Sequence, residues 1–68
     1  MRINNTIYIN KTKEVLEAKG IKQTWLAEQL GKDPSTVSKW CSNKMQPSLE
    51  MLSQIAKTLN VDTKELIN

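Results

Sequence analysis

The segment GKDPSTVSKWCSNK, residues 31–44, decides how the chain is expected to fold. Gly31 ends one helical pattern, and Asp33-Pro34 starts another, with an N-cap residue followed by proline at the first helical position. Only Val37 and Trp40 are large and apolar, so they are expected to face the core. The remaining side chains are small, hydroxyl-bearing or basic, which favours a short helix that contacts a partner.

A second short helix precedes this one, and only three residues join the two. An apolar stripe that includes Leu26 and Ala27 predicts a helix over residues 23–30. The joint at residues 31–33 is too short for an antiparallel hairpin, so the helices are expected to meet at a sharp angle, as in a helix-turn-helix. The small side chain of Ala27 would let the helix at 34–42 approach closely.

Capping residues mark three further helical segments, at residues 10–20, 48–60 and 62–67. Asn10 and Ser48 are the expected N-caps of the first two, and Asp62 with Glu65 forms a capping-box-like pair for the last. The 48–60 segment has a core face at helical spacing: Leu49, Leu52, Ile55, Ala56 and Leu59. The predicted fold class is all-α, a compact bundle of five short helices containing a helix-turn-helix.

The first nine residues, MRINNTIYI, differ from the rest of the chain. Alternating Ile7, Tyr8 and Ile9 predict a short extended arm or strand, so we divide the chain into an arm at 1–9 and a helical domain at 10–68. An isolated strand needs a partner. The arm would pair with its copy in a dimer, fold onto the helices or stay mobile, and a frayed terminus is an equal alternative.

Composition limits the function classes. Residues 1–44 hold eight lysines and arginines against four acidic residues, whereas 45–68 hold two against three. This asymmetry suits an anionic partner such as nucleic acid, although a merely lysine-rich surface would look the same. The chain has no histidine and one cysteine, so we expect no metal, no cofactor and no enzyme activity. We expect no membrane segment or secretion signal and a cytoplasmic, nucleoid-associated protein.

The outward side of the helix at 34–42 carries groups that suit a DNA major groove. Its small residues permit close approach, its hydroxyls can bond to base edges, and Lys39 can reach guanine or a phosphate. The Thr36 methyl group can contact thymine. These outward residues are Pro34, Ser35, Thr36, Ser38, Lys39 and Ser42.

From Lys13 to Ile67 the chain resembles the phage-repressor/Cro-like (XRE-type) helix-turn-helix family. The resemblance covers about four-fifths of the chain and depends on an ordered set of landmarks: Gly20-Ile21, Gln23, Leu26-Ala27, Leu30-Gly31, Ser35-Thr36-Val37-Ser38, Trp40, Asn43-Lys44, Pro47-Ser48, Leu52, Ile55-Ala56 and Leu66. The chain departs from the family pattern at Cys41, where an acidic residue is common, and at Asn43, where glycine is common.

The resemblance implies a role for each matching position. It places base-reading residues at Pro34, Ser35, Thr36, Ser38 and Lys39. It places phosphate contacts at Gln23, Asn43 and Lys44. Lys22 and Lys32 flank the same surface but depart from the family pattern, and we add them and Ser42 to the expected phosphate-binding residues. The leading hypothesis is a transcriptional regulator, a repressor, that binds a palindromic double-stranded operator as a dimer, because a monomer of this size reads only a few base pairs. Candidate dimer surfaces are the arm, Met51 and the Leu66/Ile67 end.

Three side chains have more than one interpretation. Trp25 falls at a usually exposed position, where it would contact a dimer mate or the DNA backbone, or fold over Lys22 or the end of the helix at 34–42. Cys41 is expected to be a small buried hydrophobe rather than a redox switch, which would need exposure and a low pKa. Trp40 is expected to be core. The alternative function is an antitoxin-type or other protein-interaction module that uses Trp25 or the arm.

Overall fold

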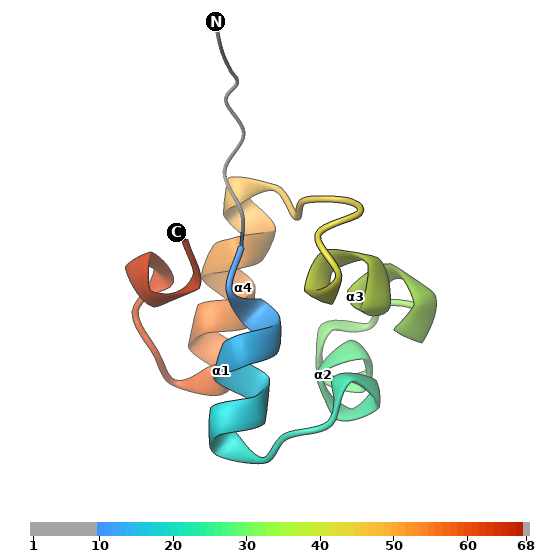
Figure 1. Cartoon of the computed structure of the whole chain (residues 1–68), viewed down its shortest axis with the longest axis horizontal. Coiled ribbons are helices and arrows are strands. Elements are labelled where there is room, and N and C mark those ends of the chain that lie inside the picture. The colour runs from blue at the N-terminus through green and yellow to red at the C-terminus, as the bar shows by residue number, and fades with distance from the viewer. Residues whose placement is uncertain (1–9, 68) are drawn as a thin grey trace, which may run out of the picture.

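The computed structural model describes residues 10–67, and this part of the chain is helical (Figure 1). Four α-helices are followed by one 3-10 turn: α1 (Thr12–Lys19), α2 (Gln23–Leu30), α3 (Pro34–Cys41), α4 (Leu49–Leu59) and η1 (Thr63–Leu66). The all-α prediction is confirmed for the described residues, but the predicted fifth helix is a single 3-10 turn. The arm predicted at residues 1–9 lies outside the described residues.

Local capping chemistry sets most of the helix ends. The Ser48 hydroxyl accepts from the Met51 amide at 3.0 Å, and Asp62 and Glu65 form a reciprocal capping box. Asn60 ends α4 in the left-handed conformation, with φ of 60°. These three features confirm the predicted starts and ends in the C-terminal half.

Two helix ends differ from the prediction. Helix α1 begins at Thr12 with Lys11 at the N-cap position, so the prediction that Asn10 occupies this position was wrong. The Asn10 side chain nevertheless accepts from the Thr12 amide, although the helix itself begins one residue later than predicted. Helix α3 ends at Cys41 instead of residue 42, because Ser42 has left helical geometry and serves as its C-cap.

The core is built from all five elements. Its buried apolar side chains are Leu16, Leu26, Ala27, Val37, Trp40, Cys41, Leu52, Ile55, Ala56, Leu59 and Leu66. The predicted inner face of α3 is therefore confirmed. Leu49 was wrongly placed in the core and is 70% exposed, because the first turn of α4 extends beyond α1 and α3 (Figure 1). Leu66 is fully buried, which removes it from the candidate dimer surface.

Helices α2 and α3 pack on each other more extensively than any other pair of elements. Gly31 ends α2 with φ of 66°, a left-handed conformation that a residue with a β-carbon adopts only with strain. The Lys32 amide then donates to the Ala27 carbonyl at 2.9 Å, which turns the chain toward α3. Ala27 is 1% exposed, as expected for a small residue between closely packed helices. The helix-turn-helix is thus formed as predicted.

Thr12, the first residue of α1, has a buried hydroxyl with no hydrogen-bond partner among the described residues. An unsatisfied buried hydroxyl costs free energy, so we expect Thr12→Val to raise the free energy of unfolding by about 1 kcal/mol. Urea denaturation of the two proteins measures this difference. Thr58→Val is the matched control, because the Thr58 hydroxyl donates to the Gln54 carbonyl at 2.8 Å and its loss should not stabilise. A clear loss of stability in Thr12→Val would contradict this account.

Candidate nucleic-acid interface

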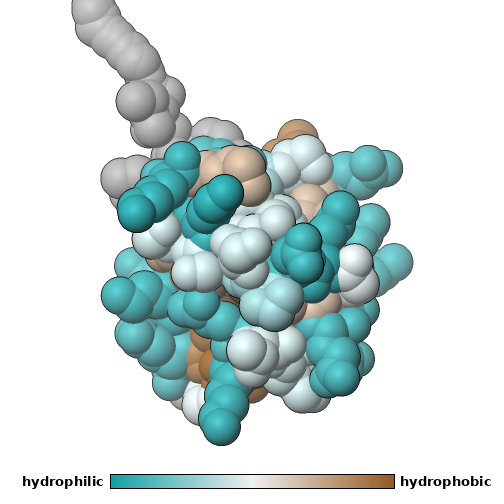
Figure 2. Space-filling view, turned by 90° about the vertical axis from the view of Figure 1, so that its right-hand side faces the viewer, coloured by the Kyte–Doolittle hydropathy of each residue, from teal (hydrophilic) through white to brown (hydrophobic). Residues whose placement is uncertain are grey.

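Helix α3 presents an exposed polar face on the side opposite its core contacts. Val37 and Trp40 anchor its inner side, at 0% and 5% exposure. The predicted base-reading residues lie on the outer side: Pro34, Ser35, Ser38 and Lys39 are exposed, and Thr36 is half-buried. Figure 2 shows the side of the molecule that carries α2 and α3, where hydrophilic and near-white residues cover most of the surface. The structure therefore brings the five predicted residues together on one short helix.

Lysines flank this helix on both sides. Lys22 lies at the N-cap position of α2, Lys32 in the turn before α3, and Lys44 in the loop after it, and all three side chains are exposed. Gln23 is the first residue of α2 and is half-buried. Exposed lysines that precede and follow α3 in the chain can bond to an anionic backbone, which the positive N-terminal end of the helix also attracts.

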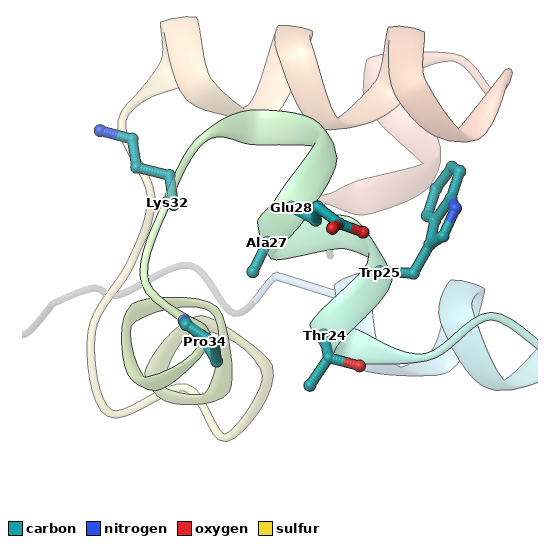
Figure 3. Close-up of a pocket in the computed structure, with 6 residues that line it drawn as sticks. All are labelled: Thr24, Trp25, Ala27, Glu28, Lys32 and Pro34. Carbon is teal, nitrogen blue, oxygen red and sulfur yellow. The ribbon is translucent and has the colours of Figure 1, made fainter.

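A shallow hollow of about 420 Å³ lies between α2 and the start of α3 (Figure 3). Thr24, Lys32 and Pro34 contribute to its wall. Thr24 is an exposed hydroxyl at the second position of α2 that was not selected from the sequence. Its closeness to Pro34 depends on the angle between the two helices, which no sequence pattern gives.

Trp25 is 42% exposed, which confirms the prediction that it lies on the surface. In Figure 3 its ring points away from Pro34 and α3. A second hollow beside it is lined by Gly20, Ile21, Lys22 and Trp25. This direction disfavours a contact with DNA that is bound at α3 and leaves a protein contact or a local contact with Lys22 as the remaining interpretations.

Hydrogen bonds connect the loop between α3 and α4 to the last turn of α3. Asn43 adopts φ of 61°, as expected for a residue at a position where glycine is common. The amides of Lys44 and Met45 both donate to the Lys39 carbonyl, at 3.0 and 3.3 Å. The Ser42 hydroxyl donates to the same carbonyl at 3.3 Å. The loop is therefore held close to the end of the predicted reading helix.

The Asn43 side chain makes its hydrogen bonds within the protein. Its Oδ1 accepts from Gln46 Nε2 and from the backbone amide and Nδ2 of Asn10, each at 3.0 Å. Its Nδ2 donates to the Asn10 carbonyl at 3.3 Å. The predicted phosphate ligand thus has a structural role that the sequence analysis missed, together with Asn10 and Gln46. The one available signal was the position of Asn10 before the first helix, which was interpreted as a cap.

Cys41 is buried and forms no disulfide. Burial raises the pKa of its thiol above the ordinary 9.0, and Glu14 and Glu17 act in the same direction, while Lys13 opposes them. A thiol that is neutral and buried at pH 7 meets neither requirement for a redox switch, so the interpretation as a buried hydrophobe is confirmed.

The described part of the chain offers neither a metal-binding cluster nor a membrane-spanning helix. Residues 10–67 contain no group of histidine, cysteine or acidic side chains that is arranged to hold a metal ion. No helix in this range combines the length and the apolar character that crossing a lipid bilayer requires.

Comparison with known proteins identifies the family. The helix-turn-helix family matches residues 13–66 of the chain. The fold is also similar to the crystal structure of a candidate DNA-binding protein from Bacteroides fragilis, at 53% sequence identity and a TM-score of 0.89, over 91% of this chain and 100% of the other. No curated protein matched the sequence. The chain belongs to the XRE/Cro-type helix-turn-helix family.

Proposed function

We propose that this protein is a sequence-specific regulator that binds double-stranded DNA, with residues 10–68 as its DNA-binding domain. The observation that carries the proposal is the exposed face of α3, where small polar side chains and Lys39 stand between exposed lysines. Side chains of this kind bond to base edges in the major groove, and lysines bond to phosphates. The similar protein from Bacteroides fragilis, a candidate DNA-binding protein itself, supports this function, and the family points to a regulator rather than an enzyme.

In the proposed complex the exposed side of α3 lies in the major groove. Pro34, Ser35, Thr36, Ser38 and Lys39 contact base edges. Lys22, Gln23, Lys32, Ser42 and Lys44 contact the phosphate backbones that border the groove. Asn43 supports the phosphate contacts only indirectly, because its side chain is hydrogen-bonded to Asn10 and Gln46.

We further propose that the protein acts in the cytoplasm, as a dimeric repressor on a palindromic operator. One α3 helix touches only a few base pairs, and two copies separated by about one helical turn would raise both affinity and specificity. Met51 and Ile67 are half-buried and remain candidates for the dimer contact.

Selection of bound sequences from a random duplex pool at physiological salt tests this proposal. We expect recovery of a palindrome whose half-site spacing reports a dimer. Recovery of no motif, with binding to the pool no stronger than that of a neutral control protein, would overturn the proposal.

A second candidate function is protein recognition, as in an antitoxin. The exposed and outward-pointing ring of Trp25 supports it, because large exposed aromatic residues mark contact surfaces. Salt discriminates the two functions. Binding to DNA should weaken steeply with salt because counterions are released, whereas a contact centred on Trp25 should depend weakly on salt.

Lys39 and Lys44 form a matched pair for testing the two kinds of contact. We expect Lys39→Ala to weaken binding to the selected sequence by about 1–3 kcal/mol and binding to random DNA by much less, because it loses a base contact. We expect Lys44→Ala to weaken both equally and to reduce the salt slope by about one unit, because it loses a phosphate contact. Equal losses for Lys39→Ala on both DNAs would make it a phosphate contact, and an unchanged slope would remove Lys44 from the interface.

A further inference from the structure

Three amide side chains meet where the end of α3 approaches the start of α1. We call Asn10, Asn43 and Gln46 the amide cluster. Asn10 lies 33 residues before Asn43 and 36 before Gln46, so the cluster joins distant parts of the chain. Asn10 is 1% exposed, whereas the other two are half-buried. A polar side chain as deeply buried as Asn10 is stabilising only if its hydrogen bonds are made.

The Asn10 Nδ2 group has two hydrogens to donate, and three acceptors lie within hydrogen-bond distance of it. The nitrogen lies 2.9 Å from the Trp40 carbonyl, 3.0 Å from Asn43 Oδ1 and 2.8 Å from Gln46 Oε1. The Asn10 Oδ1 accepts from the Thr12 amide at 3.1 Å. One side chain therefore fastens the end of α3 and the following loop to the start of α1.

The same segment is fastened to the C-terminal turn. Asn10 and Ile67 form an antiparallel bridge, and the Lys11 amide donates to the Leu66 carbonyl at 2.8 Å. Contacts outside the loop therefore also hold the backbone at Asn10, so we expect this residue to keep its position when the loop moves.

We infer that Asn10 is a positioning residue for DNA binding, which holds the α3–α4 loop so that Lys44 meets the phosphate backbone. The inference rests on the proposed function. Lys44 follows directly after Asn43, whose left-handed backbone the cluster holds through its side chain. The Lys44 amide is bonded to Lys39, so the same loop geometry joins the phosphate contact to the reading helix.

The pattern of donors and acceptors explains why an asparagine is needed. Its amide group faces three acceptors, and its oxygen faces one donor. Alanine would remove the donor to Gln46 Oε1 and the acceptor of the Thr12 amide. Asn43 Oδ1 and the Trp40 carbonyl would keep other donors. Aspartate would place a carboxylate against the three acceptors. Both changes should loosen the loop while the apolar core remains as it is.

The test measures binding to a short duplex that carries the selected sequence, with the full chain, in four proteins: wild type, Asn10→Ala, Lys44→Ala and the double variant. We expect Asn10→Ala to weaken binding about tenfold in the wild-type background and less than about threefold in the Lys44→Ala background, because coupled residues act non-additively. Ile55→Val is the control, since it reduces stability within the core and should leave affinity unchanged at a temperature where every variant is folded.

A second variant and a second measurement guard against unfolding of Asn10→Ala. Gln46→Ala removes the half-buried Gln46 side chain, which is one acceptor of the amide cluster. We expect it to weaken DNA binding in the wild-type background and to have a smaller effect in the Lys44→Ala background. Amide hydrogen exchange at Lys44 and Met45 should become faster in both variants, while that in α4 should stay as in the control.

The outcomes separate the inference from the proposed function. If the wild type does not bind the duplex, the proposed function fails. If the wild type binds but Asn10→Ala loses the same factor with and without Lys44, or loses nothing, the positioning role of Asn10 is overturned. Unchanged amide exchange at Lys44 and Met45 would overturn it as well.

Discussion

Trp40→Ala is expected to remove most of the free energy of unfolding. The indole ring is 5% exposed and lies on the inner side of α3, so its loss leaves a cavity in the core. Replacing a buried tryptophan with alanine costs about 3–5 kcal/mol. A domain of this size has a total stability of only about 3–10 kcal/mol. Urea denaturation followed by far-UV circular dichroism measures the loss and does not depend on tryptophan fluorescence.

Trp25→Ala is the matched control for this prediction. It makes the same chemical change on the neighbouring helix, but the Trp25 ring is 42% exposed. Its removal should change stability by less than about 1 kcal/mol, because little core contact is lost. Similar losses in the two variants would contradict the assignment of Trp40 to the core and Trp25 to the surface.

The helix ends could be predicted where one residue and its near neighbours determine them. Pro34 fixes the start of α3, and Ser48 caps α4 through an amide three residues ahead. Asp33 occupies the predicted N-cap position with extended backbone, although its side chain makes no capping bond. These interactions join residues that lie within a few positions of one another, so a short stretch of sequence is enough to predict them.

Features that depend on distant contacts could not be predicted in this way. Leu49 has the helical spacing of a core residue, but it is 70% exposed, whereas Leu52 in the same turn of α4 is fully buried. The last turn is a 3-10 helix with a capping box, and a capping box in the sequence does not distinguish this helix type from an α-helix. Periodicity describes which residues share a face, and it does not describe what covers that face.

The candidate site divides in the same way. The exposed side of α3 followed from two apolar anchors on a short helix, and the structure places the five predicted base-reading residues there. The role of Asn43 did not follow, because its hydrogen-bond partner Asn10 lies 33 residues away. The direction of Trp25 depends on the angle between α2 and α3, which is a property of the packed core.

Ser38→Glu is expected to reduce affinity for DNA by at least about a hundredfold, since a negative charge placed against a like-charged surface costs several kcal/mol. Ser38 is exposed in the middle of α3, so the substitution leaves the folded protein intact. In the proposed complex, however, the new carboxylate would lie among acceptor groups of bases and phosphates. Titration of a labelled duplex bearing the selected operator, at fixed salt, measures the change.

Ser53→Glu separates this local effect from the change in net charge. Ser53 is an exposed serine in α4, a helix that contributes no residue to the proposed interface. Both variants reduce the net charge from its value of +3 by one unit, so long-range attraction to DNA falls equally in the two. We expect Ser53→Glu to lower affinity less than about threefold, because screening weakens a charge that lies beyond a Debye length from the phosphates. If both variants lost affinity to the same extent, the exposed side of α3 would not be the surface that lies in the groove.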